Sequence, residues 1–547
     1  MRTEIVTTPE RSWLMARVRK EGTSAEIAVR AILDDLGNEY ESNVKDLPGS
    51  PDLANRDYEW AIFVHGCFWH AHEGCSRWKV PSRNQAFWEE KFKQNKARDK
   101  RKLEQLAEID YSVLVVWECE LGDKIRLENR LREYLYPVEK YVYSPSKKSV
   151  TRTIQLRSGD KYSTRLFVND IDVESWDSRA AYDLALLRKS TPREISDSLE
   201  VVRCVDLFSG CGGLSLGALE ACSAIGKKFL PIAALDNNPI ALDVYERNFK
   251  GVNKFESNIW NIIDGKIGTN VTKNERKFVN EVGPVNICLS GPPCQGYSDL
   301  NNFTRREDPK NELYMRVARF VEIANPEHIL IENVPRVIHG KGREVEKSHA
   351  IIESLGYNVD EAIIDLSSLG VPQKRKRHVL IGSISKKIKI KQIIKKFKVK
   401  QKTTTNWAID DLENVERKSV FNAPSRHTIV NKKRIQYLID NDLFDLPNHM
   451  RPLCHQNNNH SYISMYGRMK PDELAQTITS GYGSPGQGRF IHPTRPSTIT
   501  PHEAARLQFF PDYFDFSSVN KRTKLAEMIG NAAPMKLSYV FCIEFLG

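Results

Sequence analysis

Short runs of apolar residues, each ended by a polar or glycine-rich turn, recur along the chain between residues 201 and 382. Runs of this kind, bounded by turn signals, are typical of strands that are buried on both faces. The clearest of them end at Leu207, Leu235, Leu289, Ile331 and Gly382. Segments that suit helices, such as 214–222, lie between them. The alternation predicts an open α/β sheet, which binds its ligands where the strands end.

Glycine and acidic residues stand at the ends of the first two runs. The first passes into Asp206-Leu207-Phe208-Ser209-Gly210-Cys211-Gly212-Gly213, and glycines at a strand-to-helix turn let the backbone approach a ligand closely. The spacing does not match the dinucleotide fingerprint. The second run ends in Asp236. Its carboxylate could accept both hydroxyls of a ribose, or it could cap the helix that Asn237-Asn238-Pro239 opens.

A cysteine stands behind two prolines after the third run, in Gly291-Pro292-Pro293-Cys294-Gln295-Gly296. The prolines fix two φ angles, so the Cys294 thiolate would be presented in one direction. The alternative is a buried free cysteine beside a tight turn. Glu332-Asn333-Val334-Pro335 follows the fourth run, and Gln373-Lys374-Arg375-Lys376-Arg377 precedes the fifth.

Taken in this order, and with Gly530-Asn531 near the C-terminus, these motifs resemble those of the DNA cytosine-5 methyltransferases across residues 201–547. The resemblance implies a Rossmann-like methyltransferase domain with a small target-recognition domain, and S-adenosyl-L-methionine as its cofactor. The cofactor-binding residues that it implies are Asp206, Phe208, Gly210, Gly212, Gly213, Asp236, Asn258, Pro293 and Asn531.

The same resemblance assigns the catalytic roles. Cys294 would add to carbon 6 of cytosine, which makes carbon 5 nucleophilic enough to take the methyl group. Glu332 would contact ring N3 and the exocyclic amine. Arg377 and Arg375 would hold the carbonyl oxygen and the flanking backbone. Because a thiolate cannot reach a base inside a duplex, the target cytosine is expected to flip out of the stack.

Two positions depart from the family pattern. The family usually carries an acid after its third strand, whereas this chain has Asn258, whose side-chain oxygen can still accept a hydrogen bond. Ala532 follows Gly530-Asn531, where the family often has serine. Neither change touches the thiolate, the acid or the arginines. The domain is therefore expected to be active, with weaker or retuned cofactor binding.

A second group of chemically active residues lies in the N-terminal part of the chain. Cys67, His72 and Cys75 are spaced like zinc ligands, and Cys119, after a predicted strand at 111–117, would complete a tetrahedron of three cysteines and one histidine. Disulfides are not expected in an intracellular protein. The alternative is a set of free core cysteines with surface histidines.

Residues 10–135 resemble the very-short-patch mismatch endonucleases, called Vsr. The matching parts are 11–19, Thr23-Ser24-Ala25-Glu26, Pro51-Asp52, the 65–75 block and Trp117-Glu118-Cys119. The resemblance implies a restriction-endonuclease-like fold, a PD-(D/E)xK variant, with a structural Zn²⁺. One extra residue between His72 and Cys75 is expected to be the weaker point of the zinc site.

The Vsr resemblance also implies an active site. Asp52 and the backbone carbonyl of residue 64 would bind Mg²⁺, and His65 and His70 would transfer protons. Glu26 and Asp99 would orient the water and the histidines. The aromatic residues Phe68, Trp69 and Trp88 would wedge between base steps. For Trp88 the alternative is a place in the core.

The chain, at 547 residues, is longer than one domain usually is. The motifs predict an endonuclease domain at 1–137, a linker with a small hairpin at 138–200, a catalytic domain at 201–402, a target-recognition region at 403–465 and a closing part at 466–547. Nine lysines stand between Lys386 and Lys402. They predict either a solvated edge strand or helix face, or an arm that contacts the DNA backbone.

The net charge of +11 fits a polyanionic partner. No apolar segment approaches the length of a membrane span, and the start of the chain lacks a signal core. We therefore expect a cytoplasmic, nucleoid-associated, prokaryotic protein with no membrane partner. We expect a monomer that binds double-stranded DNA and works beside a separate restriction enzyme or mismatch-repair proteins.

Together the two resemblances predict a cytosine-5 methyltransferase fused to an endonuclease that nicks T:G mismatches, the lesion that deamination of 5-methylcytosine creates. One alternative is a single-chain restriction-modification enzyme that cuts unmethylated sites. Another is that the N-terminal half only binds DNA. Methylation of RNA is a third, disfavoured by the repair partner. The target sequence stays open.

Overall fold

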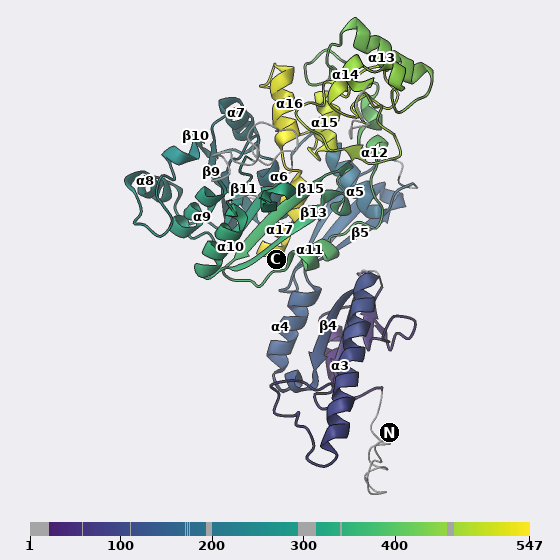
Figure 1. The fold of residues 1–547 in the computed structure, drawn as a ribbon, viewed down its shortest axis with the longest axis vertical. Coiled ribbons are helices and arrows are strands. Elements are labelled where there is room, and N and C mark those ends of the chain that lie inside the picture. Colours follow the sequence, from purple (N-terminus) through teal and green to yellow (C-terminus); the bar gives the residue numbers. More distant parts are fainter. Residues whose placement is uncertain are drawn as a thin grey trace. The chain divides into compact units, whose positions relative to one another are not determined.

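The computed structural model describes residues 21–56, 58–109, 111–169, 171, 173, 175–192, 200–293, 313–339, 342–456 and 464–547. The chain divides into two compact units (Figure 1). Unit 1 contains Met1–Val138 and Gln155–Asp160, and unit 2 contains Glu139–Ile154 and Lys161–Gly547. In the described part of the chain, no helix combines the length and the apolar character that crossing a membrane requires.

Unit 1 is built on a four-stranded sheet in the order β1-β2-β3-β4. The strands are β1 (Glu41–Ser42), β2 (Leu53–Asn55), β3 (Trp60–His65) and β4 (Ser112–Trp117). Since β3 and β4 are parallel, the chain needs a crossover between them, and this contains the long helix α3 (Gln85–Glu108). The other helices are α2 (Ser24–Asp35), η1 (Glu118–Gly122) and α4 (Lys124–Leu135).

Both faces of the unit 1 sheet are covered by apolar side chains. Successive residues of β3 alternate between two separate clusters: Trp60 and Ile62 belong to one, and Ala61 and Phe63 to the other. This follows from the two-residue period of a strand. The sheet is therefore rigid up to His65, where the polar residues of the unit begin.

Unit 2 contains a seven-stranded sheet in the order β10-β9-β8-β11-β12-β15-β13. The strands are β10 (Asn253–Glu256), β9 (Lys228–Asp236), β8 (Val201–Leu207), β11 (Ile287–Ser290), β12 (His328–Asn333), β15 (Lys376–Ser383) and β13 (Asn358–Asp365). The first five run parallel, and β15 is antiparallel to both β12 and β13. This confirms the predicted α/β sheet.

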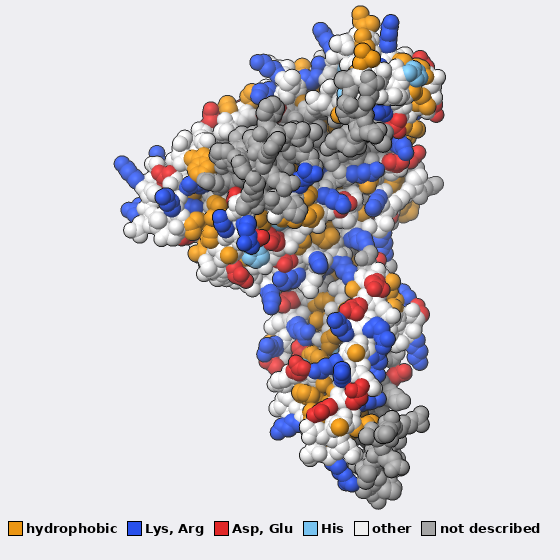
Figure 2. Space-filling model, viewed as in Figure 1, with side chains coloured by type: hydrophobic (Ala, Val, Ile, Leu, Met, Phe, Trp, Pro, Cys, Tyr) orange, Lys and Arg blue, Asp and Glu red, His pale blue; other side chains and the backbone are white. Residues whose placement is uncertain are grey.

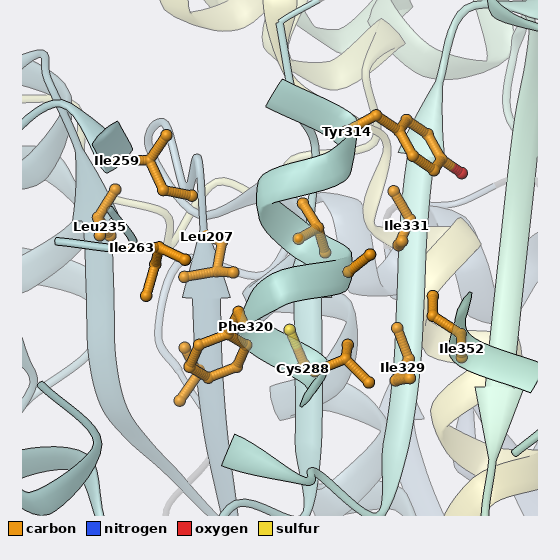
Figure 3. Packing of buried hydrophobic residues seen from close by; sticks show 14 of the residues in the cluster. Leu207, Leu235, Ile259, Ile263, Cys288, Tyr314, Phe320, Ile329, Ile331 and Ile352 are labelled. Carbon is orange, nitrogen blue, oxygen red and sulfur yellow. The ribbon is translucent and has the colours of Figure 1, made fainter. Parts of the chain in front are cut away.

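Helices cover the faces of this sheet. They are α6 (Gly213–Ala224), α7 (Pro239–Asn248), α8 (Lys273–Val282), α9 (Leu313–Ala324), α10 (Glu344–Ser354) and α17 (Met535–Leu546), with the short helices η3 (Ile259–Asn261), η6 (Pro335–His339) and η7 (Leu366–Leu369). Figure 3 shows Phe320 of α9 packed against the strands near Leu207 and Cys288. This core fixes the strand ends, which carry the candidate site.

Residues 138–187 differ from the expected linker. They form the three-stranded sheet β5-β6-β7 and a helix: β5 (Val138–Ser144), η2 (Pro145–Lys147), β6 (Ser149–Gln155), β7 (Lys161–Phe167) and α5 (Ser178–Leu187). Val150, Val168, Ala181, Tyr182 and Ala185 form its apolar cluster.

The lysine-rich run contains the helix α11 (Ile390–Lys396). Ile390 and Ile393 are buried, while Lys389 and Lys396 pair with Asp360 and Glu544. The run therefore forms a helix whose apolar face is buried in unit 2, and it is not an extended arm.

The rest of unit 2 consists of short elements. They are α12 (Thr405–Ile409), η8 (Asp410–Leu412), α13 (Ile429–Asp440), η9 (Asn448–Met450), α14 (Leu453–Gln456), η10 (Pro485–Gln487), α15 (Pro501–Leu507) and α16 (Arg522–Asn531), with the parallel strand pair β14 (Gln373–Lys374) and β16 (Ala475–Gln476). Ile435, Leu438, Leu446 and Ile491 form a separate small core.

Candidate active sites in the two units

The glycine-rich turn after β8 has a backbone that few residue types adopt. Phe208, Gly210 and Gly212 have positive φ angles of 58°, 52° and 96°. For phenylalanine this conformation is strained, and such strain gathers at ligand sites. A Cβ at Gly212 would lie 2.4 Å from the Phe249 ring, and one at Gly213 would lie 2.4 Å from the carbonyl oxygen of Ala533. The turn therefore needs both glycines.

The turn leaves room for a ligand beside a carboxylate. A Cβ at Gly210 would meet no described atom within 4 Å. Ser209 Oγ is buried and has no hydrogen-bond partner among the described residues. Asp236, at the end of β9, accepts from the Gly210 amide at 2.8 Å and from the Asn238 amide at 2.9 Å. Burial raises the pKa of this carboxyl.

Asp236 does not cap the helix that follows it, α7. Asn238 is the N-cap of α7, and its side chain accepts from the amides of Ile240 and Ala241. Asp236 instead ties the end of β9 to the glycine-rich turn. A carboxylate held beside an open turn of backbone fits the hydroxyls of a ribose-containing cofactor.

Asp206 lies beneath the turn and is buried. Ser215 Oγ donates to its Oδ2 at 2.6 Å, and the Tyr245 hydroxyl lies 2.7 Å from Ser215 Oγ. Burial raises the pKa of Asp206 to about 7, and the charge of Asp236 adds to this rise. Asp206 therefore supports the turn from below, through partners that the motif alone did not reveal.

We expect Asp206→Asn to remove a pH-dependent loss of stability. Since the folded-state pKa is raised, the stability that the protonated Asp206 carboxyl contributes is fully present below about pH 4 and is lost as the pH rises to about 7. The loss amounts to about 4 kcal/mol. Asparagine keeps the hydrogen bond from Ser215 without the charge. Hydrogen exchange of the β8 amides at pH 5 and pH 8 measures the difference.

The matched control is Asp472→Asn, which replaces an exposed acid of the same unit. It should leave the pH dependence of exchange unchanged. An Asp206→Asn protein that loses protection between pH 5 and pH 8 as the wild type does would contradict the assignment.

The other predicted cofactor residues lie at neighbouring element ends. Asn258 is exposed, and its Oδ1 accepts from the Trp260 amide at 3.2 Å. An amide oxygen has two lone pairs, so a second hydrogen bond to a ligand is available. Pro293 is exposed just after β11, and Asn531 is the exposed last residue of α16.

An acid and an arginine form the polar pair at the ends of β12 and β15. Arg377 Nε lies 2.5 Å from Glu332 Oε1, and both side chains are 12% exposed. Asn333 Nδ2 donates to the Pro292 carbonyl at 3.3 Å, which ties the β12 end to the segment after β11. Cys294, the predicted nucleophile, lies outside the described residues and directly follows Pro293.

Arg375 occupies a different place from the one expected. Its side chain is 1% exposed, and its guanidinium donates to the carbonyls of Ile478 and Ala532, each at 2.9 Å. It therefore holds the backbone around residues 530–532 and does not share the position of Arg377. Arg375 lies between β14 and β15, outside both strands, so its side chain does not follow the alternation of β15 that places Arg377 beside Glu332.

The predicted catalytic residues of unit 1 meet near the end of β3. The rings of His65 and His70 stack with centroids 3.8 Å apart, and Asp99 Oδ2 lies 2.6 Å from His70 Nδ1. Asp52 Oδ2 accepts from the Val64 amide at 2.7 Å. Glu26 accepts from the Gly22 amide and is buried. The segment 11–19 of the Vsr resemblance lies outside the described residues.

Burial shifts the pKa values of Asp52 and His65 so that each favours its neutral form. It raises the pKa of Asp52 to about 6, and together with His70 it lowers the pKa of His65 to about 3. The Asp52 carboxylate and the backbone carbonyl of Val64, near the end of β3, offer oxygen ligands of the kind that Mg²⁺ takes. A neutral imidazole next to them can accept a proton.

Asn95 is a supporting residue that the motif search missed. It lies four residues before Asp99 on the same face of α3, and its Nδ2 donates to the Trp69 carbonyl at 2.9 Å. A buried asparagine at this helical spacing from a predicted site acid is the signal that could have found it.

Cys67, His72, Cys75 and Cys119 are brought together by the structure. Their donor atoms all lie within 4.8 Å of one another, and His72 Nδ1 is 3.6 Å from Cys67 Sγ and 3.3 Å from Cys119 Sγ. The His72 ring stacks on Trp117 at 4.1 Å. Three sulfurs and one nitrogen suit Zn²⁺, and the extra residue before Cys75 does not keep its sulfur away.

The predicted wedge residues form one aromatic cluster. Ring centroids are 5.3 Å apart for Phe68 and Trp69, 5.3 Å for Phe68 and Trp88, and 5.7 Å for Trp88 and Phe92. Phe92 is buried, whereas the other three are half-buried. Trp88 thus has one side in the cluster and another side accessible.

The family model of the C-5 cytosine-specific DNA methylases matches residues 202–542. The chain belongs to this methylase family. The type II methyltransferase M1.BsuMI of Bacillus subtilis is 42% identical over 398 residues, which are 73% of this chain and 93% of that protein. The methylase sheet, cofactor turn and Glu332–Arg377 pair described above lie within the matched range.

Unit 1 carries a Vsr-type nicking endonuclease domain. The model of the DNA mismatch endonuclease Vsr matches residues 3–77. The type II nicking enzyme V.XorIIP of Xanthomonas oryzae is 42% identical over 135 residues, 25% of this chain and 98% of that protein. The Escherichia coli DNA mismatch endonuclease Vsr is 36% identical over 130 residues, 23% of this chain and 83% of that protein. The chain thus joins a methylase to an endonuclease.

Proposed function

We propose that this methylase transfers a methyl group from S-adenosylmethionine to a flipped cytosine in one duplex sequence, and that its endonuclease unit nicks T:G mismatches. The Asp52–His65–His70–Asp99 arrangement carries the proposal. A domain kept only for binding DNA has no need of stacked histidines beside buried acids. Both catalytic constellations therefore serve reactions on double-stranded DNA.

In the methylase unit, the glycine-rich turn and Asp236 would hold the cofactor. The open space at Gly210, the unpaired Ser209 hydroxyl among the described residues and the Asp236 carboxylate support this placement. Bound S-adenosylmethionine supplies a methyl group on a sulfonium. Phe208, held at a strained φ, orients the cofactor from the same turn.

Cys294 adds as a thiolate to carbon 6 of the flipped cytosine, and Glu332 holds ring N3 as charge develops. After carbon 5 is methylated it loses its proton to a base, the 5,6 double bond re-forms and the thiolate of Cys294 leaves. Arg377 keeps the Glu332 carboxylate in place and presents its guanidinium to the carbonyl oxygen of the base. Arg375 acts indirectly, because its guanidinium holds the backbone that carries Asn531.

The target sequence is read by residues 403–465. In this region the first turn of α13 combines exposed Ile429 and Val430 with the exposed basic residues Lys432 and Lys433. Figure 2 shows apolar and basic side chains side by side at this tip of unit 2. Apolar side chains suit thymine methyl groups and lysines suit phosphates, which supports α13 as part of the reading surface.

In the endonuclease unit, Asp52 and the Val64 carbonyl would hold Mg²⁺, which polarises the scissile phosphate when bound. His65 takes a proton, and Asp99 holds His70 in one orientation for a second proton transfer. Phe68, Trp69 and Trp88 open the base step at the mismatch, since a T:G pair is cheap to unstack.

We expect Cys119→Ser to lower nicking about a hundredfold while methyl transfer continues. Cys67, His72 and Cys75 lie in the loop after β3 and Cys119 lies in η1, so an ion bound by all four would tie η1 to this loop, which also carries His70. Loss of one thiolate weakens Zn²⁺ binding and frees this turn. Zinc content by elemental analysis should fall from one ion per chain, and nicking should fall about a hundredfold. Cys222→Ser, in a buried thiol of unit 2, is the control and should keep the zinc. A Cys119→Ser protein with full zinc would refute the site.

The proposed function is tested by comparing matched, T:G and hemimethylated duplexes with the purified full chain, Mg²⁺ and S-adenosylmethionine. We expect methylation of one sequence and a nick only at T:G within that sequence. Cutting of both strands of matched unmethylated DNA would instead identify a restriction-modification enzyme. Absence of any nick in all three duplexes would leave a DNA-binding module.

A further inference from the structure

The β5–α5 segment (residues 139–154 and 161–188) contributes charged side chains to a buried cluster in unit 2. Arg152 and Asp183 are 4% and 1% exposed. Lys536, on the first turn of α17, is 2% exposed, and its Nζ donates to Asp183 Oδ1 at 2.6 Å. Charges at this depth are costly unless they are paired. The cluster is therefore a built contact between this segment and α17.

A second pair of contacts joins the same two parts of the chain. Arg152 Nη1 donates to the Tyr539 hydroxyl at 2.9 Å, and this hydroxyl donates to Glu139. The Arg152 guanidinium also lies over the rings of Tyr182 and Tyr539, at 4.8 Å and 5.3 Å. Burial alone would raise the pKa of Glu139, but Arg179 and Arg152 hold it below its ordinary value. The acid therefore stays ionised inside the cluster.

The residues of α17 that enter the cluster lie in its first turns, where α17 meets α6. Ser538 Oγ donates to the Leu214 carbonyl at 2.6 Å. A Cβ at Gly217 would lie 2.1 Å from the Met535 carbonyl oxygen. Helix α6 begins at Gly213, so its N-terminal turn is the glycine-rich turn itself. The position of α17 therefore sets the position of the turn.

The segment lies ahead of the part of the chain that matches the methylase family model, which begins at residue 202. The Bacillus subtilis relative aligns with 73% of this chain, more than residues 202–547 can supply. The alignment must therefore run into the β5–α5 segment. A methyltransferase can thus carry this segment as part of its own fold.

We propose that the β5–α5 segment is a positioning element of the methyltransferase, and that Asp183, Lys536 and Tyr539 fix the glycine-rich turn for S-adenosylmethionine through α17. This inference rests on the proposed cofactor site at the turn and Asp236. None of these three residues touches the cofactor. Their effect reaches it through the close packing of α17 on Gly217 and of Ala533, which directly precedes the N-cap of α17, on Gly213.

The test uses the full chain with Lys536→Met, which keeps the side-chain length and removes the charge. We expect the KM and the Kd for S-adenosylmethionine to rise about tenfold, below the hundredfold that a misplacement of about 1 Å can cause. The kcat at saturating cofactor should stay within about threefold, because the reacting groups on β12 and β15 are untouched. Calorimetric titration and initial rates measure these quantities below the unfolding transition.

A double variant separates positioning from loss of charge pairing. Asp183→Asn together with Lys536→Met leaves no unpaired buried charge, so it should recover part of the cofactor affinity. Tyr539→Phe removes only a hydroxyl and should fold even where Lys536→Met does not. It should weaken S-adenosylmethionine binding about threefold.

Lys396→Met is the matched control. It also removes a lysine that pairs with a carboxylate of α17, here Glu544 at the far end of the helix. Cofactor affinity should be unchanged in this variant. Equal weakening by Lys396→Met, or wild-type affinity in folded Lys536→Met and Tyr539→Phe proteins, would overturn the inference.

Asp236→Asn distinguishes the two possible failures. If Asp236→Asn weakens cofactor binding and the cluster variants do not, only the positioning role is refuted. If neither Asp236→Asn nor the cluster variants change the affinity, the proposed cofactor site is refuted with it.

Discussion

Replacing Glu332 by glutamine should lower the rate of methyl transfer by a factor of about 10² to 10⁴. The Glu332 carboxylate lies 2.5 Å from Arg377 Nε and is mostly buried, so the amide would lose the ion pair and could not exchange a proton with the ring as charge develops. Binding of S-adenosylmethionine should stay the same, since Glu332 lies on β12, away from the glycine-rich turn. Single-turnover transfer of a labelled methyl group to duplex DNA measures the loss.

Glu361→Gln is the control for this variant. Glu361 lies on β13 of the same sheet and pairs with His378 at 3.2 Å. Glu361 is not one of the predicted cofactor-binding or catalytic residues, and its replacement should leave the rate of methyl transfer within about twofold of the wild-type rate. A Glu332→Gln enzyme that keeps more than a tenth of the wild-type rate would remove Glu332 from the mechanism.

Replacing His70 by alanine should lower nicking of a T:G duplex by a factor of about 10² to 10⁴, with methyl transfer unchanged. The His70 ring stacks on His65 at 3.8 Å, and Asp99 lies 2.6 Å from its Nδ1. Loss of His70 therefore removes a proton-transfer group and exposes the ring of His65. Methyl transfer by the same chain is an internal control for folding and concentration. Nicking of an end-labelled duplex measures the effect.

A double variant tests whether Asp99 acts through His70. Asp99→Asn alone should cost less than His70→Ala, and the two together should cost no more than His70→Ala, because they remove the same function. Glu104→Gln, on an exposed position of the same helix, should have no effect. Additive losses in the double variant would mean that Asp99 serves nicking independently of His70.

The residue types and their order along the chain predicted most of both candidate sites. Asp236 could be assigned to a strand end, and the structure ties it to the glycine-rich turn through the Gly210 amide. Cys67, His72, Cys75 and Cys119 could be assigned to one ion, and their donor atoms meet within 4.8 Å. This was possible because parallel strands bring their carboxyl ends to one edge, and because a metal site needs particular ligand types at short spacings.

Partners far apart in the sequence could not be predicted in the same way. Arg375 and Arg377 look equivalent in the motif, yet one donates to the carbonyls of Ile478 and Ala532 and the other pairs with Glu332. Asp206 looks like a ligand of the cofactor, yet Ser215 and Tyr245 lie beside it beneath the turn. The place of each residue inside or outside a strand and the packing of distant segments decide these roles.

The sequence by itself determined the strand ends at which the candidate sites lie, since these depend on residue type and on local periodicity. The two chemistries followed from the resemblance of its motifs to two families. Only the tertiary structure decided that residues 139–154 and 161–188 belong to the same compact unit as the methylase sheet. The polar positions of Arg152, Asp183 and Lys536 look like solvated surface in one dimension. They are buried because the segment folds onto α17, and charges at such depth are stable only with partners hundreds of residues away.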